Sequence, residues 1–98
     1  MQFFPANAGG FEQITSLNTV KTLTIPTGAT GVFLQAETQN VRWRADGTAP
    51  TSSVGMILYA GDPPTYFSST GSDALVSLGA MIFIEATASA KINVTYVY

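Results

Sequence analysis

The stretch AMIFIEATASAKINVTYVY, residues 80–98, decides the fold. From Ile92 onward every second residue is apolar and the residues between them are mostly polar. This period of two is typical of a β-strand with one buried face. The short segment TASA, residues 87–90, separates this strand from the apolar run before it. We therefore expect two antiparallel strands joined as a hairpin.

The apolar run, residues 80–86, does not identify its buried face as clearly. Ala80, Ile82, Ile84 and Ala86 share one face, but Met81 and Phe83 on the other face are apolar as well. The segment GMILYA, residues 55–60, is also apolar on both faces. Strands of this kind lie between two covers. In a chain with few helices the simplest second cover is another subunit, and we predict that Met81 and Phe83 lie at such an interface.

The rest of the chain is divided into short runs by turn residues about every twelve positions. Strands are expected at residues 19–25 and at 32–38, where Val32, Leu34 and Ala36 point inward. Regular turn signals between short strands are typical of a sandwich or barrel. We predict an all-β fold, a small antiparallel β-sandwich that is jelly-roll-like, over residues 13–98. Residues 1–12 are expected to form an irregular N-terminal arm.

The composition excludes several classes of function. Only four residues are basic and six are acidic, with a net charge of −2, so the phosphate-neutralising surface of a nucleic-acid-binding protein is missing. A membrane-surface role fails for the same reason. No apolar stretch is long enough to span a bilayer, and the N-terminus does not have the pattern of a signal peptide. So low a charge content suggests that much of the surface lies against other protein, unless uncharged threonine, serine, asparagine and glutamine keep it hydrated instead.

The chain has no histidine and no cysteine. The common general bases, nucleophiles and transition-metal ligands are therefore absent, and we predict no enzymatic activity, no catalytic residues and no cofactor. Asp46, Asp62 and Asp73 lie in turns and are the residues that a calcium ion would use, but their spacing matches no calcium-binding loop. A metal site is not predicted.

The segment VRWRAD, residues 41–46, places the one tryptophan between two arginines. In a strand, Trp43 points away from Arg42 and Arg44, so we predict that Trp43 is buried in the core. The arginines are expected on the outer face, either solvated and weakly paired with Glu37 or Glu85 or bracing a subunit seam. A sugar site with Trp43 as its stacking platform would require an exposed ring.

The N-terminal arm carries three phenylalanines. Because arms are disordered unless they are tied down, we predict that this one docks on the domain or on a neighbour. The predicted interface residues are Phe3, Phe4, Phe11, Arg42, Arg44, Met81 and Phe83.

Three segments, VRWRADGTAPT (residues 41–51), GMILYAG (55–61) and FIEATASAKINVTY (83–96), resemble a family of small virion structural proteins of tailed phages. The family pattern is V-R-W-R-x-D-G-T-x-P-T followed later by F-I-E-A-T-A-S-A-K-x-N-V-T-Y. The resemblance covers roughly a third of the chain. It implies a capsid cement or decoration protein, made in the host cytoplasm and assembled into the virion. Its expected partners are the major capsid protein and other copies of itself, most simply as a homotrimer.

An alternative function is a tail- or fibre-associated module that binds host-surface carbohydrate. Its aromatic residues would be Tyr59, Tyr66 and Phe67, in and beside the turn-rich loop that begins at residue 60. A plain surface connection is the simpler explanation of that loop.

Overall fold

The computed structural model describes residues 10–68 and 78–98. No helix within these ranges is long and apolar enough to cross a membrane. The elements are β1 (Gly10–Ile14), β2 (Lys21–Thr22), β3 (Gly31–Glu37), β4 (Val41–Arg44), β5 (Met56–Leu58), β6 (Thr65–Ser68), a 3-10 turn (Leu78–Ala80), β7 (Ile82–Glu85) and β8 (Lys91–Val97).

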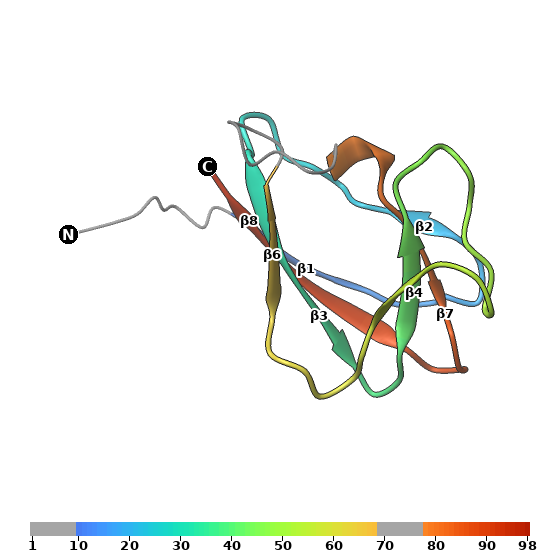
Figure 1. The fold of residues 1–98 in the computed structure, drawn as a ribbon. Coiled ribbons are helices and arrows are strands. Elements are labelled where there is room, and N and C mark those ends of the chain that lie inside the picture. The colour runs from blue at the N-terminus through green and yellow to red at the C-terminus, as the bar shows by residue number, and fades with distance from the viewer. Residues whose placement is uncertain (1–9, 69–77) are drawn as a thin grey trace.

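The eight strands form two four-stranded antiparallel sheets that face each other (Figure 1). One sheet has the order β1-β8-β3-β6 and the other β2-β7-β4-β5. Successive strands alternate between the sheets except at β4 and β5, which are neighbours in one sheet. This order is that of an eight-stranded jelly roll, so the predicted all-β sandwich is confirmed.

Strands β3 and β8 carry the alternation that the sequence predicts. Val32 and Leu34 of β3 are fully buried, as are Ile92 and Val94 of β8. The two strands pair along seven residues, so these side chains form one continuous inner surface. They make up the centre of the core, and burying each large aliphatic side chain contributes roughly 1.5–3 kcal/mol.

Strand β7 is turned the other way from the prediction. Met81 and Phe83 are fully buried between the sheets, whereas Ile82 and Ile84 are partly exposed on the outer face. Phe83 lies opposite Trp43 of β4, so its large ring fills the space between the sheets. The predicted placement of Met81 and Phe83 at an interface is therefore wrong.

The predicted hairpin at residues 87–90 is also wrong, because β7 and β8 belong to different sheets. Ser89 has a φ of 75°, and its N–H is bonded to the Glu85 carboxylate at 3.2 Å. The following Ala90 is buried. The segment thus carries the chain across the edge of the core and does not fold it back on the same sheet.

The N-terminal boundary differs as well. Residues 10–12, expected in the arm, belong to β1 and pair with β8. Phe3 and Phe4 lie outside the described residues. The strand expected at residues 19–25 is reduced to the two residues of β2.

Candidate functional site

Three aromatic side chains lie in one row across the outer face of the sheet β1-β8-β3-β6. Phe11 is opposite Thr95, Thr95 is opposite Phe33, and Phe33 is opposite Tyr66. Phe11 is 67% exposed, Tyr66 48% and Phe33 41%. We call Phe11, Thr95, Phe33 and Tyr66 the aromatic row. Single exposed apolar side chains are normal, but a contiguous group of them marks a binding surface.

Tyr66 is held in this row by two neighbours. Its ring centre is 5.0 Å from that of Phe33, at an interplanar angle of 47°. On its other side the ring covers Gly31, where an added Cβ would lie 2.8 Å from Tyr66 Cε1. A glycine is therefore needed for the ring to lie against the sheet in this position.

Polar side chains form the next row on the same face. Gln13 lies opposite Asn93 and Asn93 lies opposite Gln35. Gln13 Nε2 donates to Asn93 Oδ1 at 2.9 Å, and Asn93 Nδ2 donates to the Glu37 carboxylate at 2.8 Å. A longer bond of 3.4 Å joins Asn93 Nδ2 to Gln35 Oε1. We call Gln13, Asn93 and Gln35 the amide row. Its mutual bonds fix the orientation of the central amide.

A hollow of about 230 Å³ lies where the two rows meet. It is lined by Phe11, Phe33, Gln35, Pro64, Asn93 and Thr95. Phe11 and Phe33 flank Thr95 from the strands on either side, so their Cα positions are about 10 Å apart by strand spacing. We call this space the aromatic hollow. Its lining combines the ring surfaces of two phenylalanines with uncharged polar groups.

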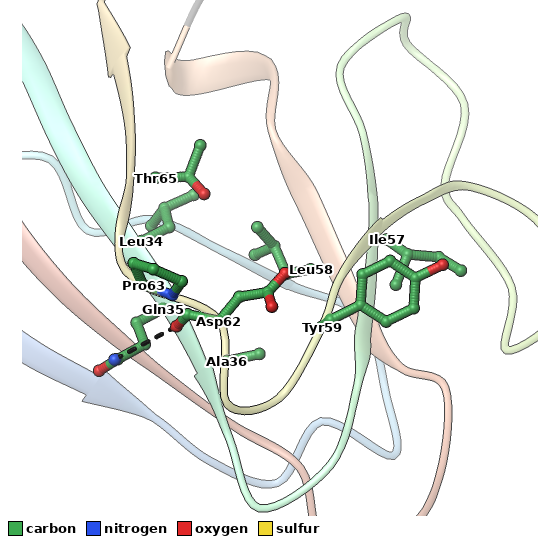
Figure 2. Close-up of a pocket in the computed structure, with 9 residues that line it drawn as sticks. All are labelled: Leu34, Gln35, Ala36, Ile57, Leu58, Tyr59, Asp62, Pro63 and Thr65. Carbon is green, nitrogen blue, oxygen red and sulfur yellow. Dashed lines mark hydrogen bonds between the residues drawn. The ribbon is translucent and has the colours of Figure 1, made fainter.

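The loop between β5 and β6 forms a second, smaller pocket of about 50 Å³ against β3 (Figure 2). Gln35 Nε2 is 3.5 Å from the Asp62 backbone oxygen, which ties the loop to the strand. In Figure 2, Tyr59 lies apart from these two residues, on the Ile57 side of the pocket. The space holds little more than water, so the pocket is a seam between loop and sheet.

The three aromatics of the proposed carbohydrate loop do not form one platform. Tyr66 is on the outer face, whereas Phe67 lies opposite the buried Val32 and packs against the core. Neighbours along a strand point to opposite faces. A site that uses both Tyr66 and Phe67 together with Tyr59 is therefore not present.

Trp43 faces the interior, as predicted, but it is only partly buried. It packs against the core, and its ring meets Phe67 edge to face, with centres 5.3 Å apart at 82°. The ring is therefore less buried than predicted. Trp43 also lines a hollow beside β5.

The two arginines do not pair with Glu37 or Glu85. Arg42 donates to the backbone oxygens of Ser52 and Gly55, at 3.1 and 2.9 Å. Arg44 makes a two-bonded ion pair with Asp46, at 3.0 and 2.5 Å. These bonds raise the pKa of the Arg44 guanidinium and lower the pKa of the Asp46 carboxyl. Both arginines therefore hold the loop that leads from β4 to β5.

Strand β5 presents an apolar edge next to this loop. Met56 is 61% exposed and Val54 is 53% exposed. Together with Trp43 and the ion pair of Arg44 and Asp46 they line a hollow of about 460 Å³. We call Val54, Met56 and this hollow the β5 edge surface.

A partly buried acid joins β1 to β8 and to the chain after β2. Glu12 accepts a short hydrogen bond from the Tyr96 hydroxyl and another, of 3.1 Å, from the Thr24 N–H. Burial, and then the bond to Glu12, raise the pKa of the Tyr96 hydroxyl well above its ordinary value. Both partners are satisfied, so the contact is structural.

Within residues 10–68 and 78–98, no group of three acidic side chains could hold a metal ion. Asp46 is occupied by Arg44, and Asp73 lies outside the described residues.

Sequence reasoning missed the aromatic row. The signal was present at Phe33, an apolar residue at a position where the alternation of residues 32–38 requires an outward side chain. Placing Phe33 in one row with Phe11 and Tyr66 requires the registers of the pairs β1–β8, β3–β8 and β3–β6. The sequence alone does not give these registers.

Comparison with protein-family models, with curated proteins and with solved structures finds no match for this chain.

Proposed function

We propose that the chain is a non-enzymatic structural protein of a bacteriophage particle, a capsid cement or decoration protein that works as a homo-oligomer. The observation that carries the proposal is the β5 edge surface. Val54 and Met56 are exposed apolar side chains on and beside a strand at the end of its sheet. Edge strands with unprotected apolar side chains associate with other chains. Here no lysine lies on β5 to prevent such contact.

The β5 edge surface is also well ordered before any partner binds. Arg42 fixes the backbone at Ser52 and Gly55, and the Arg44–Asp46 pair fixes the start of the same loop. Thr51 and Val54 bond to each other through their backbones, at 2.9 and 3.3 Å. A preorganised surface loses less conformational entropy on binding. This favours a contact surface over a loop that only connects two strands.

The fold and the sequence resemblance support the same function. Jelly rolls occur in viral capsid and lectin domains, although a fold alone does not determine a function. The resemblance to small tailed-phage virion proteins includes Val41–Thr51, the segment that builds the wall of the β5 edge surface. We propose the major capsid protein and further copies of this chain as the partners, in the virion.

A trimer is the oligomer that we propose, because a trimer on a local threefold axis would contact several capsid subunits at once. Many weak contacts then add up to firm attachment. The low number of charged residues is compatible with this arrangement, because other subunits would cover much of the surface.

Light scattering after size exclusion tests the self-association. We expect a mass near three times the chain mass of 10.3 kDa for the wild type and a monomer for Met56→Lys, because a charge at an apolar contact opposes its burial. Val20→Lys is the matched control, since Val20 is exposed to a similar extent at a different place. A monomeric wild type, or equal effects of the two substitutions, would contradict the proposed assembly through β5.

Capsid binding is tested with particles of the phage that encodes the chain, prepared without its gene. The purified protein should co-sediment with these particles and raise the temperature at which they release DNA. Met56→Lys should do neither, while Val20→Lys should behave as the wild type. Co-sedimentation with tails but not with heads would place the protein elsewhere in the particle and refute the cement function.

A further inference from the structure

The aromatic hollow is separate from the β5 edge surface and has no role in the function proposed above. It lies on the outer face of the other sheet, between Phe11 and Phe33, over Thr95. We propose that this hollow binds a sugar ring of a neutral glycan. The proposal goes beyond assembly and does not depend on it.

The two kinds of lining match the two kinds of surface on a sugar. A pyranose ring presents C–H groups on its faces and hydroxyls around its edge. Phe11 and Phe33 offer ring surfaces on two sides of the hollow, and aromatic faces carry a partial negative charge that attracts C–H groups. The Thr95 hydroxyl between them is both a donor and an acceptor.

The amide row supplies further hydrogen-bonding groups in a fixed orientation. Asn93 is held by Gln13 and by Glu37, so the row does not need to rearrange when a ligand arrives. Within the described part of the chain, Gln13 Oε1 takes part in no hydrogen bond, and Gln35 Nε2 makes only the 3.5 Å bond to the loop. These groups remain open to sugar hydroxyls at the edge of the hollow.

The charges around the hollow argue against an anionic ligand. None of the six lining residues is charged. Glu37 accepts a hydrogen bond from the lining residue Asn93, and Lys91 lies opposite Glu37 in the next row. A phosphate, sulfate or carboxylate ligand would therefore lack a counter-charge in the lining.

The position of the hollow argues against an extended peptide. Peptides that add to a sheet bond to the free backbone groups of an edge strand. The floor of this hollow is formed by Asn93 and Thr95 of β8, which is paired on both sides, with β1 and with β3. Only side chains are available to a ligand there, which is the usual situation for a bound sugar.

The test is a titration of the full ¹⁵N-labelled chain with three neutral probes, cellohexaose, maltohexaose and N-acetylchitohexaose, followed by NMR. We expect at least one probe to shift the amide signals of Phe11, Phe33, Gln35, Asn93 and Thr95. A heparin hexasaccharide, which is anionic, should leave them unshifted. Phe33→Ala should weaken binding at least about tenfold, while Phe33→Tyr should restore most of it.

Tyr59→Ala is the matched control, because Tyr59 is an exposed aromatic outside the hollow. It should bind the probe as the wild type does. Thermal unfolding must show that Phe33→Ala is folded, and Phe11→Ala, at the most exposed of the aromatic positions, provides a second test with less risk to the fold.

Three results would overturn the proposal. The first is the absence of shifts with all three probes, and the second is a set of shifts that Phe33→Ala and Phe11→Ala leave unchanged. The third is a concentration-dependent shift of the same signals without sugar, which would show that a second copy of the chain covers this face. None of these results bears on the β5 edge surface, whose test is the mass of the Met56→Lys variant.

Discussion

Replacement of Trp43 by alanine measures how far the sandwich encloses its one tryptophan. Removing a fully buried tryptophan costs about 3–5 kcal/mol. Trp43 packs against the core and also lines the hollow of the β5 edge surface, so roughly half of that loss is expected. The edge-to-face contact with Phe67 adds about 0.5–1.5 kcal/mol. We therefore expect a loss of about 2–4 kcal/mol in the free energy of unfolding.

Urea unfolding followed by far-ultraviolet circular dichroism measures this loss, since the variant has no tryptophan fluorescence. Trp43→Phe is the control, because it keeps an aromatic ring in the same place. A double-mutant cycle with Phe67→Leu should give a coupling of about 0.5–1.5 kcal/mol between the two rings. A loss below about 0.5 kcal/mol or a coupling of zero would refute the inward packing of the ring. A loss above about 4 kcal/mol would show that the ring is completely enclosed.

Three further substitutions test single contacts by urea unfolding or hydrogen exchange. Arg42→Ala should cost about 1–2 kcal/mol and speed amide exchange over residues 52–55, because the Ser52 and Gly55 oxygens lose their donor; unchanged exchange there would contradict the bracing role. Gly55→Ala should lower the free energy of unfolding more than Gly47→Ala does. Both glycines have positive φ, but only at Gly55 does an added Cβ come within 3.1 Å of Pro50 and of the Trp43 oxygen. Equal losses of stability would show that the backbone conformation alone decides the effect. The free energy of unfolding of the wild type should fall as pH rises above 10.0, the ordinary pKa of tyrosine. The reason is that the unfolded chain loses the Tyr96 proton first, while the folded protein retains it. Tyr96→Phe should remove this part of the fall at alkaline pH, and an unchanged fall would refute the raised pKa of Tyr96.

The sequence was sufficient to predict the fold class and the buried faces of two strands. In β3 and β8 the inward positions are apolar and most outward positions are polar, so each strand has one possible orientation. In β7 both faces are apolar, and the sequence pattern leaves the orientation open. The structure buries the larger pair, Met81 and Phe83, and leaves Ile82 and Ile84 partly exposed. The space between two sheets is filled best by the longer side chains.

Partners that depend on loops or on register could not be predicted. Arg42 bonds to backbone oxygens ten and thirteen residues away, and backbone groups carry no signal in the sequence. Arg44 pairs with Asp46, two residues along the chain, and not with the more distant acids that the alternation suggested. The predicted hairpin failed for a related reason, since a short loop fits both a hairpin and a crossing between sheets.

The separation of the two candidate surfaces has a consequence for affinity. A hollow of about 230 Å³ is smaller than the pockets of roughly 300–1,000 Å³ that enclose drug-sized ligands, so one copy of the chain should hold a sugar only weakly. The β5 edge surface shares no residue with this hollow, so association through β5 would leave the hollow open in every copy. Linked copies gain about 10²–10⁴ in avidity without any new contact. A weak site of this kind would therefore become effective on an assembled particle, and the β5 substitution Met56→Lys should reduce binding to a glycan-coated surface while leaving the affinity for a single soluble oligosaccharide unchanged.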